Sequence, residues 1–458
     1  MATKPRIAKG TRDFNAQQIA QREYIFSTIK SNFKRFGFAP IETPSFELSE
    51  TLLGKYGDEG DRLIFKILNS GDKVKKADLK ALEEGQLARF SNSLSEKALR
   101  YDLTVPFARY VAQYQNDITF PFKRYQIQPV WRADRPQKGR FQEFYQCDAD
   151  AVGSDSLWQE VEFIQLYDAV FSDLKLEGVT IKINNRKILA AIAERIGAQD
   201  KLIDFTVALD KLDKIGAEKV KEEMLQKGIP SDGIETLQPL FNMTGDFQDQ
   251  LAALKSLLGS SEIGSAGLSE LEFISTTIKN LGLKTAILKL DVTLARGLNY
   301  YTGAIFEVSA PEGVAMGSIG GGGRYDDLTS IFGLKGVSGV GISFGLDRIA
   351  LVLEELNLFP ENSTQSTTQV LFANFGSNES LYSYKAIQSL RSRGIVAELY
   401  PDPSKLKKQI TYANKRGIPY VVLVGDEEMA ANTFTLKNMS TGTQETVDLK
   451  TLIARFSL

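Results

Sequence analysis

The sequence contains no histidine among its 458 residues and a single cysteine, Cys147. The absence of histidine excludes Ser-His-Asp hydrolases, Cys-His enzymes, histidine-ligated metal sites and acid–base catalysis by imidazole. The single cysteine excludes a disulfide within the chain and a cysteine-rich zinc site, and we expect Cys147 to be a small buried apolar residue. Any chemistry must therefore use carboxylates, arginine, lysine, tyrosine and the backbone.

Long apolar runs and a large net charge are lacking as well. No stretch approaches roughly 18 uninterrupted apolar residues, so we expect no membrane span. Residues 1–6 lead into no apolar segment of the kind found in secretory signals, and we therefore expect a cytoplasmic protein. The net charge is −2, from 55 Lys and Arg against 57 Asp and Glu, so a nucleic acid would have to bind through local basic patches.

The residue pattern divides the chain into several parts. Residues 17–36 are predicted to form a helix, and the Lys- and Glu-rich residues 184–281 have helical periodicity that indicates an inserted helical domain. Residues 361–369 are polar and predict a linker. The β-α-β-α-β rhythm that follows indicates a small α/β domain.

A long antiparallel hairpin is the most informative feature of the first half. Residues 122–134 and 141–152 alternate with period 2 and flank a loop with Pro and Gly, as expected for paired strands. Side chains two apart share a face of a strand, so we expect Arg132 and Asp134 on one side of the first strand. On one side of the second strand we expect Phe144, Gln146, Asp148 and Asp150.

The side chains of this hairpin suit a nucleotide. The planar guanidinium of arginine can bind two phosphate oxygens at once. Arg132 is expected to project from the first strand, and Arg135 and Arg140 lie in or beside the loop. Phe144 offers an aromatic face for a base. The alternative is a surface hairpin with solvated arginines, and spacing alone does not separate the two interpretations.

Three further segments each have a functional and a structural interpretation. Residues 320–323 are four glycines without a phosphate-loop spacing, and a tight turn or sheet kink is favoured over a ligand-binding backbone. Asp102 and Thr104, two apart in an extended chain, could accept hydrogen bonds from an ammonium group, but taken alone they are better explained as a helix N-cap. The lysines after residue 404 form either a phosphate-binding face or a solvated helix face, of which the second is favoured.

Several segments together resemble the histidyl-tRNA synthetase family of class II aminoacyl-tRNA synthetases. Residues 132–144 resemble the motif 2 hairpin, residues 341–349 resemble motif 3, and residues 38–44 are similar to motif 1, whose proline packs at a dimer interface. Three other segments, residues 9–14, 296–303 and 318–325, resemble parts particular to the histidine-specific enzymes.

The resemblance implies an α+β fold and an ATP-consuming ligase. It implies an antiparallel sheet flanked by helices, a helical insertion and a C-terminal α/β anticodon-binding domain. The substrates would be L-histidine, ATP with Mg²⁺, and tRNA(His), and the enzyme would be a homodimer. The predicted boundaries are 1–183 and 284–358 for the two parts of the catalytic core, 184–283 for the insertion, 359–369 for the linker and 370–458 for the anticodon-binding domain.

The resemblance also implies roles for individual residues. Arg132 and Arg296 would act on the carboxylate and α-phosphate; ATP would be held by Arg132, Asp134, Arg140, Phe144 and Arg348. Histidine would be held by Asp102, Thr104, Gln146, Asp150, Tyr300 and Tyr301, and the tRNA acceptor end would meet Arg135 and Gln137. Gln142 stands where many members have arginine, and the metal ligands are not indicated.

A chain without histidine is compatible with this chemistry. The carboxylate of a free amino acid is already ionised at neutral pH, so its activation by ATP needs no base from the enzyme. Two other classes stay open: a synthetase-like regulatory subunit of histidine biosynthesis without catalysis, and an RNA-binding protein. The regulatory subunit should lack the motif arginines or the C-terminal domain, whereas this chain has Arg132, Arg140, Arg296 and Arg348.

Overall fold

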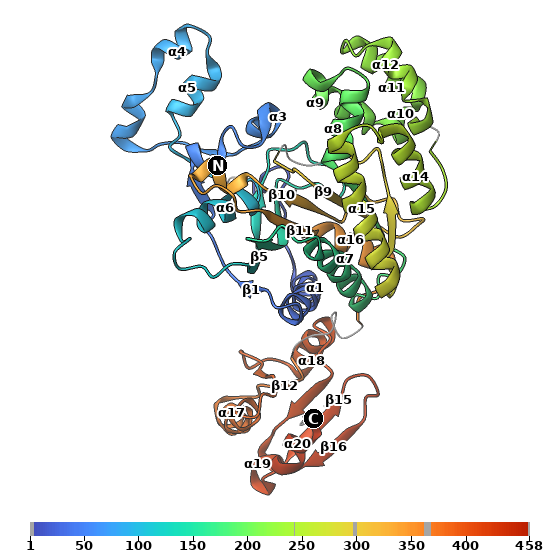
Figure 1. Cartoon of the computed structure of the whole chain (residues 1–458). Coiled ribbons are helices and arrows are strands. Elements are labelled where there is room, and N and C mark those ends of the chain that lie inside the picture. The colour runs from blue at the N-terminus through green and yellow to red at the C-terminus, as the bar shows by residue number, and fades with distance from the viewer. Residues whose placement is uncertain (1–3, 242, 296–299, 361–367, 457–458) are drawn as a thin grey trace. The chain divides into compact units, whose positions relative to one another are not determined.

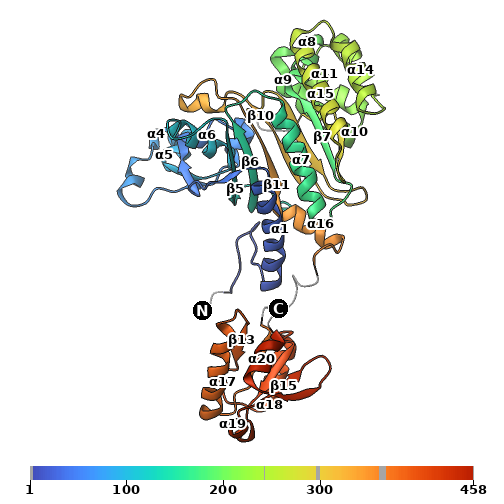
Figure 2. The same cartoon turned by 60° about the horizontal axis from the view of Figure 1, so that its bottom comes forward.

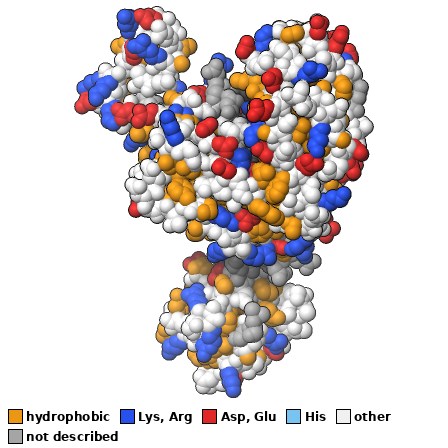
Figure 3. All heavy atoms as spheres, in the orientation of Figure 1, with side chains coloured by type: hydrophobic (Ala, Val, Ile, Leu, Met, Phe, Trp, Pro, Cys, Tyr) orange, Lys and Arg blue, Asp and Glu red, His pale blue; other side chains and the backbone are white. Residues whose placement is uncertain are grey.

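The computed structural model describes residues 4–241, 243–295, 300–360 and 368–456. The chain divides into two compact units, Met1–Phe359 and Pro360–Leu458 (Figure 1). In the part of the chain that is described, no helix is long and apolar enough to cross a membrane. Acidic and basic side chains intermingle on the face of the first unit seen in Figure 3, in keeping with the small net charge.

An eight-stranded sheet forms the centre of the first unit, in the order β1-β5-β6-β11-β10-β9-β7-β8. Its strands pair antiparallel except β1 with β5 and β7 with β8, which are parallel. The bounds are β1 Ala39–Pro40, β5 Phe122–Trp131, β6 Glu143–Val152, β7 Thr180–Asn185, β8 Ile287–Leu290, β9 Ala304–Ser309, β10 Gly320–Tyr325 and β11 Gly339–Gly345.

Three helices cover one face of this sheet: α1 (Ala16–Arg35), α7 (Trp158–Asp173) and α16 (Leu346–Glu355) (Figure 2). Helix α1 begins where Asn15 and Gln18 form a reciprocal capping box, which agrees with the helix predicted over residues 17–36. Phe33, Tyr167 and Phe344 are fully buried and pack ring against ring between helices and sheet. Cys147 lies in the same core, as expected.

The hairpin is present, but its first strand is shorter than predicted. Strand β5 ends at Trp131 because the chain changes partner there: the Arg132 N–H still donates to the Gln142 carbonyl (3.0 Å), whereas the Ala133 N–H donates to the Leu63 carbonyl (2.8 Å). The expectation that Arg132 and Asp134 share a strand face is therefore wrong. The second strand, β6, matches its prediction within two residues.

The four glycines form a strand, so the prediction of a turn or kink is wrong. They belong to β10, which pairs on both sides with β9 and β11. A Cβ on Gly322 would lie 2.1 Å from the Gly341 carbonyl oxygen. Side chains would push the neighbouring strands apart, so glycine permits the close packing of this part of the sheet.

A second, three-stranded sheet and several short helices precede β5. The sheet has the order β2-β4-β3. The bounds are β2 Phe46–Leu48, α2 Ser49–Leu52, α3 Gly57–Arg62, β3 Lys66–Ile67, η1 Gly71–Lys76, α4 Leu79–Glu83, α5 Leu87–Ser93, β4 Lys97–Leu99 and α6 Thr104–Gln113. The short helix η3 (Leu328–Phe332) packs on α6.

Helices fill the range in which a helical insertion is predicted. They are α8 Arg186–Arg195, η2 Gln199–Lys201, α9 Leu202–Leu209, α10 Leu212–Ile215, α11 Ala217–Gln226, α12 Ser231–Thr236, α13 Gln238–Phe241, α14 Phe247–Leu258 and α15 Glu262–Leu281. Their apolar side chains, such as Ile188 and Leu271, belong to the same buried cluster as those of the large sheet. The helices therefore share a core with the sheet, and boundaries at 184 and 283 stay a prediction.

The second unit contains the predicted β-α-β-α-β pattern and continues beyond it. Its sheet has the order β13-β12-β14-β15-β16. Strand β12 pairs parallel with both β13 and β14, whereas β15 pairs antiparallel with both β14 and β16. The bounds are β12 Val370–Phe372, α17 Ser377–Arg391, β13 Ala397–Leu399, α18 Leu406–Lys415, β14 Tyr420–Leu423, α19 Asp426–Ala431, β15 Phe434–Asn438, β16 Gln444–Val447 and α20 Leu449–Phe456.

Candidate active site

A cavity of about 410 Å³ lies on the large sheet, and most predicted site residues line it. Strand β6 supplies Phe144, Gln146, Asp148 and Asp150 to its wall, as predicted from their alternate spacing. Cys147 and Ala149, which point the other way, lie in the core under the helices. The cavity therefore occupies the face of the sheet opposite α1, α7 and α16.

Asp102 lies at one end of the cavity, and both of its carboxylate oxygens accept hydrogen bonds within the chain. Its Oδ1 accepts hydrogen bonds from the Val105 N–H (3.1 Å), which caps α6, and from the Tyr56 hydroxyl (2.9 Å). Its Oδ2 accepts from the Tyr300 hydroxyl (3.2 Å). Thr104 lines the same cavity as the first residue of α6, so the expected extended geometry of this pair is wrong. Burial raises the pKa of Asp102 above its ordinary value.

Asp150 lies in the cavity wall with two strong partners that the sequence analysis did not identify. Arg124, fully buried on β5, forms an ion pair with it at 2.7 Å, and the Tyr325 hydroxyl donates to its Oδ1 at 2.5 Å. Burial raises the pKa of Asp150, while the Arg124 charge opposes that rise. Arg124 and Asp150 are direct cross-strand partners, so the predicted hairpin already contained the signal for this pair.

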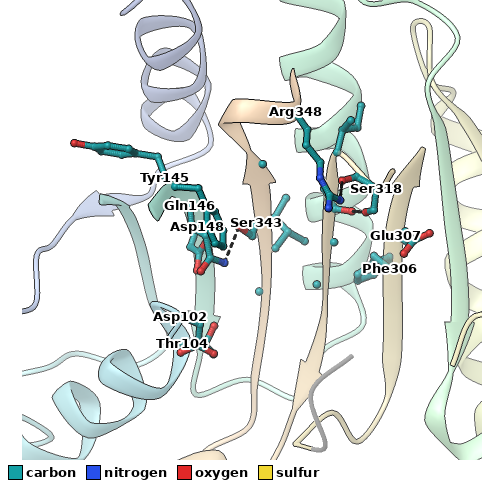
Figure 4. A pocket seen from close by; sticks show the side chains of 18 of the residues that line it. Asp102, Thr104, Tyr145, Gln146, Asp148, Phe306, Glu307, Ser318, Ser343 and Arg348 are labelled. Carbon is teal, nitrogen blue, oxygen red and sulfur yellow. Dashed lines mark hydrogen bonds between the residues drawn. The ribbon is translucent and has the colours of Figure 1, made fainter. Parts of the chain in front are cut away.

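Asp148 is a further buried carboxylate in this wall, and the sequence analysis assigned it no role. It is 2% exposed and lies opposite Ser343 of β11 in the sheet register. Burial is the main cause that raises the pKa of Asp148 to about 7, and the nearby Asp150 and Asp102 add to the rise while Arg124 and Ser343 oppose it. Figure 4 shows Gln146 and Asp148 on one strand, with Ser343 on the next.

Basic side chains surround the other part of the cavity. The Arg132 guanidinium lies 4.2 Å from the centre of the Tyr101 ring and 5.2 Å from that of Phe144. Arg140 forms an ion pair with Asp134 at 2.6 Å, so these two predicted ATP ligands contact each other. The cavity is lined by Arg132, Asp134, Arg140 and Phe144 but not by Tyr101.

Arg348 reaches the cavity from the start of α16. Its Nε donates to the Gly139 carbonyl (2.9 Å) and its Nη1 to the Ser318 carbonyl (2.7 Å; Figure 4). These bonds join motif 3 to the loop of motif 2 and to the segment that leads into β10. Glu307 of β9 also lines this region, beside Ser318.

The N-terminal segment braces the two motifs, which the sequence analysis did not foresee. Asp347, the neighbour of Arg348, forms ion pairs with Arg12 and Arg22, the latter at 2.5 Å. It also accepts the backbone N–H of Tyr145 on β6 at 3.3 Å. Because these contacts join segments far apart in sequence, local patterns do not reveal them.

The remaining predicted residues are distributed as follows. Tyr300 and Tyr301 line the cavity, and burial raises the pKa of both phenols. Arg135 and Gln137 are exposed in the hairpin loop, outside the cavity lining. Arg296 lies outside the described residues. Gln142 does not line the cavity, and its side-chain amide donates to the Asp134 carbonyl at 3.0 Å.

Comparison with known proteins identifies the family. Residues 76–349 match the family model described as Histidyl-tRNA synthetase. The chain belongs to the histidyl-tRNA synthetase family. Residues 369–457 match the model described as Anticodon binding domain, which agrees with the predicted C-terminal unit.

Relatives named Histidine–tRNA ligase match over the full length. The protein from Christiangramia forsetii is 67% identical over 452 residues, and that from Flavobacterium johnsoniae is 64% identical over 470 residues; each match covers 99% of both chains. The crystal structure of histidyl-tRNA synthetase from Nostoc sp. PCC 7120 superposes with a TM-score of 0.79 at 31% identity and covers 99% of this chain and 100% of its own. The family and fold class predicted from the sequence are thereby confirmed.

A more distant structure shares the fold alone. It is described as an ATP phosphoribosyltransferase regulatory subunit/histidyl-tRNA synthetase from Bacillus halodurans C. It superposes with a TM-score of 0.72 at 20% identity and covers 92% of this chain and 99% of its own. The fold therefore does not by itself separate a ligase from a regulatory subunit, and that distinction depends on the site.

Proposed function

We propose that this member of the histidyl-tRNA synthetase family is a histidine–tRNA ligase that binds histidine and ATP side by side in the cavity on the large sheet. It joins L-histidine to ATP, releasing pyrophosphate, and passes the histidyl group to the 3′ end of tRNA(His). The observation that carries the proposal is the composition of one continuous wall. Strand β6 runs from Phe144, beside Arg132, to Asp150, beside Tyr325 and Tyr301.

Histidine occupies the acidic end of the cavity in this proposal. Asp102, Thr104 and Gln146 surround the α-amino group, because oxygen acceptors there suit an ammonium. Asp150 accepts an imidazole N–H, and the Tyr301 hydroxyl faces the other ring nitrogen. Tyr300 holds Asp102 in place through its hydroxyl.

ATP occupies the basic end. Phe144 stacks on the adenine, with Asp134 near the adenine amino group, and Arg132 binds the α-phosphate. Arg140 and Arg348 bind the outer phosphates, which requires Arg140 to exchange its ion pair with Asp134 for phosphate oxygens. Arg296 completes the arginine set around the histidine carboxylate.

The two chemical steps need position and charge rather than an enzyme base. A carboxylate oxygen of histidine attacks the α-phosphorus, and pyrophosphate leaves as the new P–O bond forms. The ribose hydroxyl of tRNA then attacks the histidyl carbonyl, AMP leaves, and a phosphate oxygen of the adenylate takes the hydroxyl proton. Fixed guanidinium groups stabilise the charge that develops in both steps.

Mg²⁺ would enter with ATP. Among the described residues, no cluster of three acidic or cysteine side chains forms a preassembled metal site. Mg²⁺ in nucleotide sites is commonly bound by one or two carboxylates together with substrate phosphates, and Glu307 beside Arg348 and Ser318 fits that requirement. The metal neutralises phosphate charge when it is bound.

The tRNA and the partner subunit use surfaces outside the cavity. Arg135 and Gln137 meet the acceptor end, and the second unit reads the anticodon, helped by exposed lysines such as Lys405, Lys407 and Lys408. A homodimer in the cytoplasm is part of the proposal. Phe46 and Leu48 of β2, close to motif 1, are 47% and 51% exposed, as expected for apolar side chains that a partner subunit covers.

A catalytically idle regulatory subunit is the second candidate. The site favours the ligase because Arg132, Arg140 and Arg348 converge on the cavity, and the anticodon-binding unit is present. A regulatory subunit requires neither. An RNA-binding protein without catalysis would not need the acidic end of the cavity.

Exchange kinetics of Asp150→Asn test the assignment of the histidine end. The variant should raise the histidine KM or lower kcat strongly, by a factor on the order of 10 to 100, because bonds to an ionised acceptor contribute about 1.5–3 kcal/mol. The ATP KM should change little, since Asp150 lies three alternate positions along β6 from Phe144. An unchanged histidine KM and kcat would remove Asp150 from the site.

A further inference from the structure

Asp148 has acceptor capacity that the roles assigned so far do not use. It lies in the cavity wall between Gln146 and Asp150, with 2% of its surface exposed (Figure 4). Its Oδ1 has no hydrogen-bond partner among the described residues, and neither has Oε1 of Gln146. The Gln146 amide is oriented by the bond from its Nε2 to the Ser343 hydroxyl at 3.2 Å, so its oxygen is held ready to accept.

The two other carboxylates at the acidic end of the cavity, Asp150 and Asp102, already have partners within the chain. Asp150 is paired with Arg124 and with the Tyr325 hydroxyl. Asp102 accepts two bonds at Oδ1 and one at Oδ2, which leaves a single lone-pair position on Oδ2. A buried acceptor without a donor is costly, so the free oxygens of Asp148 and Gln146 indicate a cationic donor that enters with a ligand.

We propose that Asp148 is a specificity-determining residue that binds the α-ammonium of the amino acid substrate, in addition to Asp102, Thr104 and Gln146. An ammonium has three N–H donors, and Asp102, Gln146 and Asp148 each have one oxygen with open acceptor capacity in the described structure. The inference rests on the proposed function, because histidine supplies the ammonium. It adds a second carboxylate to the acceptors of this cation, close enough to Asp102 for the two charges to interact.

The groups around Asp148 influence its protonation, so its contact with the ammonium should depend on pH. Charged and titratable groups act on it from the neighbouring elements: Arg124 of β5, Arg100 and Asp102 before α6, Cys147 and Asp150 of β6, Tyr167 of α7, and Tyr301. With its raised pKa, Asp148 is partly protonated at neutral pH in the free protein. An arriving ammonium favours the carboxylate form, so histidine binding should release protons near pH 7.

Calorimetry on the wild-type protein tests the proposal without a mutation. Histidine and its analogue without the amino group, imidazolepropionate, are each titrated at pH 7 in two buffers of different ionisation enthalpy. Both ligands share the ring and the carboxylate, but the ring of the analogue is more basic because it lacks the electron-withdrawing ammonium. The protons that each ligand's own ring loses on binding are therefore subtracted first, and the remaining difference in proton release reports the ammonium contact. More protons released with histidine support the proposal, and equal release overturns it.

Asp148→Asn assigns the effect to this residue. The histidine KM in ATP–pyrophosphate exchange should rise about 10- to 100-fold, with the ATP KM within about twofold and with the inhibition constant of imidazolepropionate unchanged. The extra proton release with histidine should disappear. Equal weakening of histidine and the analogue, or a histidine KM like that of the wild type, would overturn the assignment.

Asp168→Asn is the matched control. Asp168 is also a buried aspartate, but it lies on α7 outside the cavity and accepts the backbone N–H groups of Lys284, Thr285 and Ala286. This variant should lower the melting temperature and leave the histidine KM unchanged. Wild-type protein without any histidine-dependent exchange would overturn the proposed function and the inference together, whereas normal wild-type exchange with an unaffected Asp148→Asn variant overturns the inference alone.

Discussion

Arg124→Met perturbs the buried charge that balances the acidic end of the cavity. The Arg124 side chain is fully buried, 2.7 Å from Asp150 and 4.2 Å from the centre of the Phe107 ring. It lowers the pKa of both Asp148 and Asp150 against the larger effect of burial. Methionine keeps most of the volume and removes the charge, so Asp150 loses its ion-pair partner and Asp148 loses a positive charge that lowers its pKa.

The expected loss of stability follows from this environment. Leaving one partner of a buried ion pair charged and alone costs about 3–5 kcal/mol. Asp150 avoids part of that cost by taking up a proton, because its pKa rises further in the variant. The folded variant then binds a proton that the unfolded chain has lost, so its stability falls as pH rises, by about 1.4 kcal/mol per pH unit while one proton is involved.

Thermal unfolding of both proteins between pH 5 and 8 measures this effect. The melting temperature of Arg124→Met should lie below that of the wild type, and the gap should widen toward pH 8. Histidine use in ATP–pyrophosphate exchange should also weaken, because a protonated Asp150 no longer accepts the imidazole N–H. A gap that narrows with rising pH would contradict the reasoning.

Arg109→Met is the control for this experiment. Arg109 pairs with Glu47 at 2.7 Å, but its side chain is 21% exposed and lies outside the cavity lining. We expect a loss of about 1 kcal/mol or less, since solvent screens the pair. The histidine KM should not change.

Three further predictions concern the motifs and the second unit. Arg12→Ala should raise the ATP KM about threefold to tenfold with little effect on histidine, because Asp347 beside Arg348 loses one of its two arginine partners; an unaltered ATP KM in exchange kinetics would contradict this bracing role. Gly341→Ala should abolish exchange in a folded protein, since a Cβ there would lie 2.0 Å from Asp150 Oδ1, and wild-type activity would show that Asp150 can move freely. Removal of residues 370–458 should leave exchange intact and sharply weaken aminoacylation of tRNA, because the first unit holds the whole cavity; equally efficient charging by the truncated chain would refute the role of the second unit.

The hydrophobic periodicity of the sequence predicted those helices and strands that bury one regular face against the core. Helix α1 and strand β6 follow their patterns within two residues because each packs one regular face on the core. Strand β5 ends early because the Ala133 N–H finds a partner at Leu63, a long-range contact that no local pattern contains. Strands β15 and β16 were not predicted, although the buried Phe434 and Leu436 alternate with half-buried positions before the turn at residues 439–441.

Part of the candidate site could also be predicted from the regular spacing of residues along one strand. Alternate spacing on β6 brought the wall residues together, and the family resemblance supplied their roles. Tyr325 and the contacts of Arg12 were missed because each acts through a residue distant in the chain. Arg124 was overlooked, although the register of the predicted hairpin places it opposite Asp150. The glycines of β10 were misjudged because their function is to allow close approach of neighbouring strands, which the sequence does not show.

ATP–pyrophosphate exchange by the purified full-length protein tests the central claim most directly. Exchange is measured with Mg²⁺-ATP and labelled pyrophosphate, with histidine, without amino acid, and with phenylalanine or glutamine in its place. A cavity whose polar groups pair with both ring nitrogens should favour histidine by a factor on the order of 10⁴ or more. Exchange that depends on histidine and is absent with the other two is the result this account predicts, and exchange that is absent with histidine or equal for all three would contradict it.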